Sequence, residues 1–208
     1  EGKLGGGICD SKVIQYEDDG AAVWKETDPE GYTGGWGHDG HSEVAAYRMN
    51  RLMGGDEVPQ TVYAKDGQGR LGTSQQFIEG GTLAMEGKLS DLEGMQREQV
   101  ERVLALDVIT GNGDRHVGNW LAKDGNVIAI DHGHAHWGKW EDGSYALRNS
   151  SVLKALQDRE SGKTGMIDNY VRIDHGTFAF SEQNLSQWRK ITRSDFDKAM
   201  TGVSQDRH

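Results

Sequence analysis

The chain has 208 residues, a formal net charge of −10, 35% hydrophobic residues and a single cysteine. This length suffices for one sizeable core or for two small lobes that share a cleft. The negative charge disfavours a large nucleic-acid surface and broad docking on anionic lipid, because both draw on clustered Lys and Arg. No apolar run approaches the roughly 18 residues of a membrane span. We therefore expect a cytoplasmic, globular protein that binds no nucleic acid and is not stably inserted in a membrane.

Alternating apolar residues predict strands in the first third of the chain. They cover residues 12–16, 21–25, 61–64 and 73–78. The first two flank the turn Glu17-Asp18-Asp19-Gly20, a good hairpin connection. A flexible run, Gly5-Gly6-Gly7, comes before them, and the glycine-rich residues 31–40 after them predict a mobile loop.

Helical spacing dominates the remainder. Ser42 is a candidate N-cap for a helix over residues 43–53, which Gly54-Gly55 ends. A broad apolar stripe predicts a longer helix over residues 91–109. Two short strands, joined at Asp124-Gly125-Asn126, and three more helices follow; these elements cover residues 120–122, 127–130, 151–159, 182–192 and 195–200. We expect an α+β fold with a strand-rich N-lobe over residues 1–79 and a mostly helical C-lobe over residues 80–208.

The stretch Gly111-Asn112-Gly113-Asp114-Arg115-His116-Val117-Gly118-Asn119 is the most informative part of the sequence. It places Asp114 and Asn119 on a glycine-flanked turn, and Asp131 follows at the end of an apolar strand. Phosphoryl transfer from a magnesium nucleotide needs such a set, in which one carboxylate orients the attacking hydroxyl while an amide and a second carboxylate hold metal ions. Turns are also rich in Asp, Asn and Gly, but solubility does not explain a carboxylate at the end of an apolar strand. The pattern favours catalysis by Asp114 and binding of Mg²⁺, or Mn²⁺, by Asn119 and Asp131.

Two further charges fit the same chemistry. Lys25 closes the apolar run Ala21-Ala22-Val23-Trp24, and Glu43 begins the next helix. In a kinase-type site they would form the ion pair that positions the phosphates. The alternative is an exposed lysine and a glutamate favoured by the helix dipole. Gly6 and Gly7 would cover the phosphates through backbone N–H groups, although the run does not follow the G-x-G-x-x-G pattern and a disordered tail is the alternative.

Histidines surround both loops. We expect His116 to support the catalytic loop by hydrogen bonding. His132, His134 and His136 alternate, so in an extended segment all three would point to one side, as in a metal clasp. Without nearby cysteines, we favour the interpretation that they flank the metal site at Asp131. A His-cluster metalloprotein stays open as an alternative.

Gly113-Asp114-Arg115-His116-x-x-Asn119, followed by Ile130-Asp131-His132-Gly133, resembles the catalytic and metal-binding loops of the phosphatidylinositol 3/4-kinase-like superfamily. It is also similar to the atypical secretory-pathway kinases and the HipA-type bacterial kinases. His132 stands where that pattern usually has Phe. The resemblance implies a two-lobed protein kinase-like fold of minimal size, as found in bacterial, phage or effector proteins.

The resemblance also implies a role for each matching position. Asp114 corresponds to the catalytic aspartate, and Asn119 and Asp131 to the magnesium ligands. Lys25 would contact the phosphates and pair with Glu43. Adenine would be bound by backbone groups of a hinge between the lobes, formed by Phe77, Ile78 and Glu79.

We expect from this an ATP- and Mg²⁺-dependent phosphotransferase, in the first place an atypical protein kinase acting on Ser or Thr. A protein substrate is favoured over lipid because no basic or amphipathic membrane element is evident. A phosphoinositide or other lipid kinase and an AMP-transferase stay open on the same fold. The alternative of another class is a nucleotide-binding pseudokinase that acts as an interaction module; the irregular glycine run and His132 favour it, and the complete set of charged residues disfavours it. Because the chain begins at Glu1 rather than Met, a preceding segment also stays open.

Overall fold

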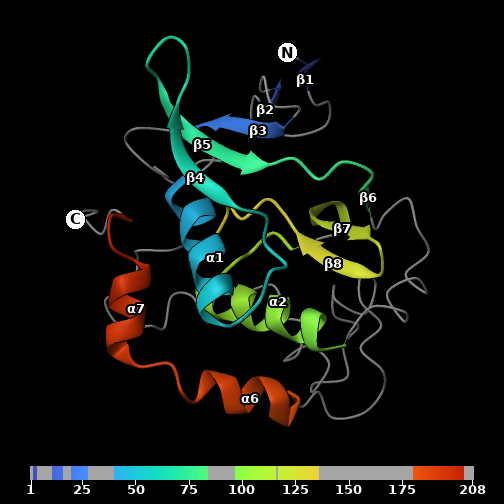
Figure 1. Ribbon diagram of the computed structural model, residues 1–208, viewed down its shortest axis with the longest axis vertical. Coiled ribbons are helices and arrows are strands. Elements are labelled where there is room, and N and C mark those ends of the chain that lie inside the picture. The colour runs from blue at the N-terminus through green and yellow to red at the C-terminus, as the bar shows by residue number, and fades with distance from the viewer. Residues whose placement is uncertain are drawn as a thin grey trace.

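The computed structural model describes residues 2–3, 11–15, 20–27, 40–83, 97–115, 117–135 and 180–203. Its larger sheet has five antiparallel strands in the order β1-β2-β3-β5-β4 (Figure 1). The strands are β1 (Gly2–Lys3), β2 (Ser11–Gln15), β3 (Ala21–Glu26), β4 (Thr61–Lys65) and β5 (Leu71–Gln76). A smaller antiparallel sheet contains β6 (Thr82–Leu83), β7 (Trp120–Lys123) and β8 (Asn126–Ala129). The helices are α1 (Gly40–Leu52), α2 (Arg97–Thr110), α6 (Glu182–Trp188) and α7 (Arg193–Ala199), with a 3₁₀ turn at Val117–Asn119.

The strands predicted from alternation are all present, with ends displaced by one or two residues. Strands β1 and β6 were not predicted. Each has only two residues and exists through its pairing with a neighbour, Gly2 opposite Val13 and Thr82 opposite Ala122. The mixture of sheets and helices confirms the expected α+β class.

The β7–β8 hairpin turns at Asp124 and Gly125, as predicted. Both residues have positive φ, 52° and 75°, which matches the type of two-residue turn that suits the twist of a hairpin. The Gln99 side chain of α2 then fixes this hairpin: its Nε2 donates to Asn126 Oδ1 over 3.1 Å, and its Oε1 accepts from the N–H of Val127 over 3.1 Å. The hairpin is therefore held on α2, at the end of which the Asp114 loop begins.

Helix α1 begins at Gly40, before the predicted start at residue 43, so the prediction of Ser42 as N-cap is wrong. Ser42 lies inside the first turn and is fully buried. Its hydroxyl donates to the carbonyl of Ala135. The tertiary contact, rather than a local cap, decides how the helix begins.

Gly40 allows the start of α1 to lie close to Thr27 and Thr73. A Cβ at this position would collide with the side chain of Thr27 and would lie 2.9 Å from Thr73 Cγ2. We expect Gly40→Ala to lower the free energy of unfolding by about 1–3 kcal/mol, the usual cost of overpacking, in urea denaturation. Gly67→Ala is the matched control, since a Cβ there meets nothing within 4 Å. Equal stability of the two variants would contradict the close packing at the start of α1.

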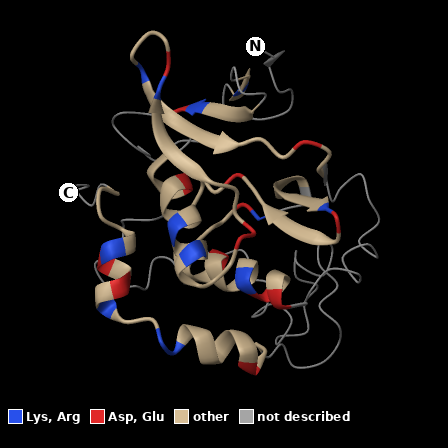
Figure 2. Cartoon of the chain, viewed as in Figure 1, with Lys and Arg blue, Asp and Glu red and all other residues tan. Residues whose placement is uncertain are grey.

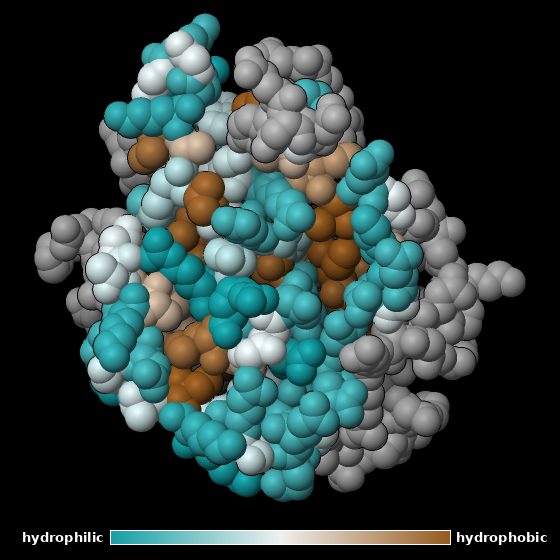
Figure 3. Space-filling model, in the orientation of Figure 1, coloured by the Kyte–Doolittle hydropathy of each residue, from teal (hydrophilic) through white to brown (hydrophobic). Residues whose placement is uncertain are grey.

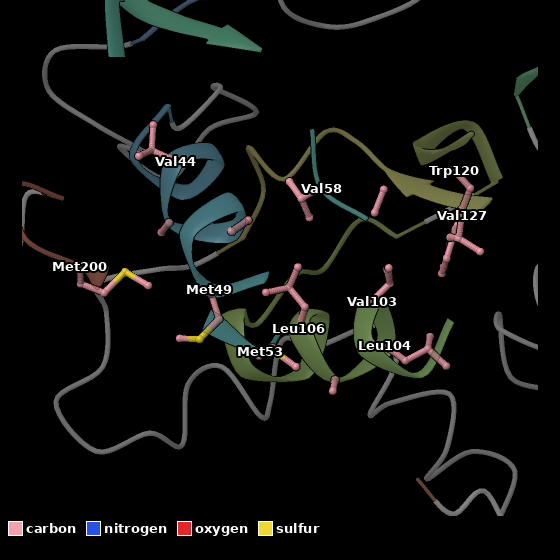
Figure 4. Packing of buried hydrophobic residues seen from close by; sticks show 14 of the residues in the cluster. Val44, Met49, Met53, Val58, Val103, Leu104, Leu106, Trp120, Val127 and Met200 are labelled. Carbon is pink, nitrogen blue, oxygen red and sulfur yellow. The ribbon is translucent and has the colours of Figure 1, made fainter. Parts of the chain in front are cut away.

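The main core lies where α1, α2 and the small sheet meet (Figure 4). Its buried members come from both sides of the predicted lobe boundary at residues 79/80; those labelled in Figure 4 are Val44, Met49, Met53, Val58, Val103, Leu104, Leu106, Trp120, Val127 and Met200. Because one cluster spans that boundary, α1 belongs by packing to the helical half as much as to the large sheet. The division into two lobes stays a prediction.

The C-terminal helices differ from the predicted bounds. Thr192 was expected to end a helix, but it is the N-cap of α7, where it forms a capping box with Asp195. Helix α7 carries basic residues near both ends and acidic residues between them (Figure 2).

The face seen in Figure 3 is largely polar, with separate apolar areas near its middle. Among the residues described, no helix combines the length and the apolar character needed to cross a membrane.

Candidate active site

A buried lysine stands at the centre of the site. Lys25, near the end of β3, places its Nζ 2.8 Å from Glu43 Oε1 and 3.0 Å from Asp131 Oδ1. Lys25 and Glu43 are buried, whereas the side chain of Asp131 is 40% exposed. The predicted Lys25–Glu43 ion pair is thus present, and the alternative of an exposed lysine is excluded.

The surrounding charges keep Lys25 protonated. Burial alone would lower the pKa of its ammonium group, but the negative charges and hydrogen bonds of Glu43 and Asp131 outweigh burial and raise that pKa above its ordinary value. The site therefore carries a fixed cation at any physiological pH. A partly dehydrated ammonium of this kind suits the binding of phosphate oxygens.

Backbone and amide contacts shape the loop from Asp114 to Asn119. The N–H of Asp114 donates to Asn112 Oδ1 over 3.0 Å, and Asn119 Nδ2 donates to the carbonyl of Asp114 over 2.7 Å. Because the Asn119 amide uses its nitrogen in this bond, its oxygen is the atom suited to a cation. The N–H of Ile130 donates to the carbonyl of Asn119 over 3.1 Å, which brings Asn119 next to the residue that precedes Asp131.

Asp131 adopts a backbone conformation that is uncommon for a side-chain-bearing residue. Its φ is 57°, in the left-handed region. Such conformations cost free energy and gather at functional sites, where the surrounding structure holds them. The oxygen donors of Asp131 and Asn119 fit Mg²⁺, which prefers carboxylate and carbonyl oxygens and keeps several waters.

The buried side chain of Arg115 connects the Asp114–Asn119 loop to the segment that leads to Asp131. Its Nε and Nη2 lie 2.8 and 3.0 Å from the carboxylate oxygens of Asp107, and its Nη1 donates to the carbonyls of Asn119 (2.7 Å) and Ile130 (2.9 Å). Asn112 Nδ2 also donates to Asp107 over 2.9 Å, and all four side chains of Asp107, Asn112, Arg115 and Asn119 are buried. No role was predicted from the sequence for Asp107, Asn112 or Arg115. The feature of the sequence that could have indicated this network is Asp107, a charged residue within the apolar stripe of the helix that leads into the loop.

His132 is fully buried between this network and the ion pair. Its Nε2 lies 2.8 Å from Arg115 Nη2, and its Nδ1 lies 3.9 Å from Glu43 Oε2. Burial, together with the positive charge of Arg115, lowers the pKa of His132 to about 4. The imidazole is therefore neutral near pH 7.

His132 and His134 do not lie in an extended segment, which the metal clasp would need. Residues 132–135 form a turn, in which the N–H of Ala135 donates to the carbonyl of His132 over 2.9 Å. No group of three or more His, Cys, Asp or Glu able to hold a metal occurs among the residues that the structure describes. His136 lies outside those residues.

The remaining predicted site residues fall into two groups. Gly6, Gly7 and His116 lie outside the described residues, as do residues 31–39 of the predicted loop over 31–40 and the predicted helix over 151–159. The predicted hinge is described: the N–H of Phe77 donates to the carbonyl of Ala21 over 3.0 Å, the carbonyl of Ile78 accepts from Gly81 over 3.3 Å, and Glu79 is exposed. The N–H of Phe77 and the carbonyl of Ile78 are thus engaged in bonds within the protein.

Comparison with known proteins points to kinases. Residues 93–149 match the family model of phosphatidylinositol 3- and 4-kinases. No curated protein sequence matches the chain.

Several solved structures overlap with almost all of the chain at low identity. The proinflammatory kinase CtkA of Helicobacter pylori shares 14% identity over 97% of this chain and 77% of its own, with a TM-score of 0.45. A Golgi casein kinase with Mn/ADP bound shares 15% identity over 98% and 71%, with a TM-score of 0.42. The Rio2 kinase of Chaetomium thermophilum, in a complex with ADP/Mg²⁺ and phosphoaspartate, shares 16% identity over 97% and 65%, with a TM-score of 0.49.

The family match covers α2, the Asp114 loop, the β7–β8 hairpin and Asp131, which are the elements that form one side of the site. The large sheet and α1 supply Lys25 and Glu43 on the other side. The described residues form an α+β fold, and residues 93–149 of it resemble the phosphatidylinositol 3- and 4-kinase family.

Proposed function

We propose that the protein is an ATP- and Mg²⁺-dependent phosphotransferase that acts on Ser or Thr hydroxyls of a protein. One observation carries the proposal: the buried Lys25 contacts Glu43 and Asp131 together, at 2.8 and 3.0 Å. These three residues come from a strand, a helix and a loop that are far apart in the sequence. Such a grouping of one lysine and two carboxylates is what phosphoryl transfer from a metal nucleotide uses.

Each residue has a role in this proposal. Lys25, fixed by Glu43, would bind the phosphates of ATP. Asn119 and Asp131 would hold Mg²⁺, or Mn²⁺, which supplies neutralisation of the charge on the phosphate oxygens. Asp114 would accept a hydrogen bond from the acceptor hydroxyl and orient it for attack. Lys25, which in this structure is bonded to Asp131, would turn toward the nucleotide when ATP binds. The carboxylate of Asp131 would then be available to the metal.

The choice of a protein acceptor rests on the acidic composition of the chain, since the net charge of −10 disfavours the anionic surface on which lipid substrates lie. A lipid kinase, an AMP-transferase and a nucleotide-binding pseudokinase predict different products from the same site. A lipid kinase labels vesicles, an AMP-transferase transfers the α-phosphate, and a pseudokinase transfers neither.

The test is incubation of the full chain with γ-labelled or α-labelled ATP in the presence of a mixed lysate. We expect label on protein from γ-labelled ATP only, and complete loss of that label when EDTA removes the divalent metal. Protein label from α-labelled ATP would indicate AMP transfer. Binding of Mg-ATP without any transfer, to protein or to phosphoinositide vesicles, would overturn the proposal in favour of a pseudokinase.

A further inference from the structure

The position after the metal-binding aspartate carries a histidine with two polar neighbours. His132 lies beneath Asp131, fully buried, with Nε2 at 2.8 Å from Arg115 and Nδ1 at 3.9 Å from Glu43. A shape-filling aromatic ring would satisfy neither neighbour. The proposed function assigns no role to this imidazole.

The direction of the proton follows from chemistry. A guanidinium only donates hydrogen bonds, so the Nε2 that faces Arg115 must be the acceptor nitrogen of the imidazole. A neutral imidazole then carries its hydrogen on Nδ1. That N–H lies on the side of Glu43, whose other carboxylate oxygen binds Lys25.

His132 thereby lies between two polar groups of the core. It is hydrogen-bonded to Arg115, but it faces Glu43 across 3.9 Å, which is beyond hydrogen-bond distance, so its Nδ1–H acts on that carboxylate only electrostatically. Arg115 in turn binds Asp107 and the carbonyls of Asn119 and Ile130, one residue before Asp131. One imidazole thus stands between the Lys25–Glu43 pair and the loop that carries Asn119.

We propose that His132 is a positioning residue, which sets the relative placement of the Lys25–Glu43 pair and the Asp114–Asn119 loop through its two ring nitrogens. It touches neither nucleotide nor acceptor and acts through Glu43 and Arg115. This inference rests on the proposed function, because its main readout is phosphate transfer. Removing the hydrogen bond to Arg115 and the electrostatic interaction with Glu43 leaves the reacting groups present but less well aligned.

Three substitutions separate the two contacts. His132→Gln keeps an acceptor at the depth of Nε2 for Arg115, His132→Asn keeps a donor at the depth of Nδ1 for Glu43, and His132→Phe keeps the ring but neither contact. We expect His132→Phe to lower kcat by about 10- to 100-fold, the range for groups that orient a ligand from behind, with KM for ATP little changed. The Gln and Asn variants should each recover part of that loss.

A role in shape alone predicts the reverse order, with the Phe variant the most active of the three. That result, or equal loss of kcat in all three variants, would overturn the inference. Asn184→Leu controls for stability, since Asn184 is equally buried in a separate polar cluster with Glu101 and Arg102. It should lower the melting temperature without lowering kcat.

The same variants distinguish failure of the inference from failure of the proposed function. If the wild-type chain transfers phosphate and His132→Phe matches it, the inference fails and the proposed function stands. If the wild-type chain transfers no phosphate, the inference is tested by melting temperatures alone. These are measured for His132→Phe, Glu43→Gln and the double variant. A shift of the double variant that differs from the sum of the two single shifts would support an interaction between His132 and Glu43, because only interacting sites are non-additive. A shift equal to that sum would overturn the inference.

Discussion

Asp114→Asn is expected to lower phosphate transfer by about 10²–10⁴-fold, the contribution of a positioned general base. The substitution keeps the size of the side chain and the backbone contacts of the loop, in which the N–H of residue 114 donates to Asn112 and its carbonyl accepts from Asn119. What is lost is the negative charge that orients the attacking hydroxyl. The measurement is kcat with γ-labelled ATP, beside the free energy of unfolding in urea.

Asp124→Asn is the matched control for this variant. Asp124 is exposed at the turn of the β7–β8 hairpin, and its φ of 52° is one that asparagine adopts readily. We expect wild-type activity and wild-type stability from it. If Asp114→Asn also turns over at the wild-type rate, Asp114 does not orient the acceptor hydroxyl and the assignment of the catalytic aspartate is wrong.

Asp107→Ala is expected to lower the free energy of unfolding by about 3–5 kcal/mol, because it leaves the buried guanidinium of Arg115 without its carboxylate. Both oxygens of Asp107 bind Arg115, at 2.8 and 3.0 Å, and one also accepts from Asn112. A loss of this size is a large share of the stability of a typical domain, about 5–15 kcal/mol. Urea denaturation at low temperature would measure it.

An exposed pair supplies the control. Asp197 lies 2.8 Å from Arg193 on α7, with side chains 52% and 84% exposed, so Asp197→Ala should change stability by less than about 1 kcal/mol. The double variant Asp107→Leu with Arg115→Met should recover part of the loss, since apolar replacement of both partners removes the uncompensated charge. Equal stability of Asp107→Ala and Asp197→Ala would show that the Arg115 contacts do not hold the loop.

The features that sequence predicted best are those that depend on neighbours along the chain. Alternation located β2, β3, β4 and β5, and the hairpin at Asp124-Gly125 followed from turn chemistry that needs no distant contact. The Lys25–Glu43 pair was also predicted, because a lysine that closes an apolar strand is unusual on a solvated surface. Local patterns thus carried the main elements and the ion pair of the candidate site.

What the sequence could not supply depends on contacts between distant residues. Arg115 and Asp107 look like ordinary surface charges until folding brings the carbonyls of Asn119 and Ile130 to the same guanidinium. The early start of α1 depends likewise on Gly40 fitting against Thr27, a contact that no local cap rule contains. The turn at residues 132–135 likewise excludes the extended segment in which His132 and His134 would point to one side.

The position of α1 in the main core has a consequence for regulation. This helix carries Glu43, and its Val44 and Met49, with Met53 just after its end, are buried in the cluster shared with α2. Swinging the helix outward to break the ion pair would expose such side chains at about 1.5–3 kcal/mol each. An on–off switch that works by displacing this helix would therefore require partial unfolding of the core. In the proposed phosphotransferase, displacement of α1 would therefore be a costly means of switching the activity off.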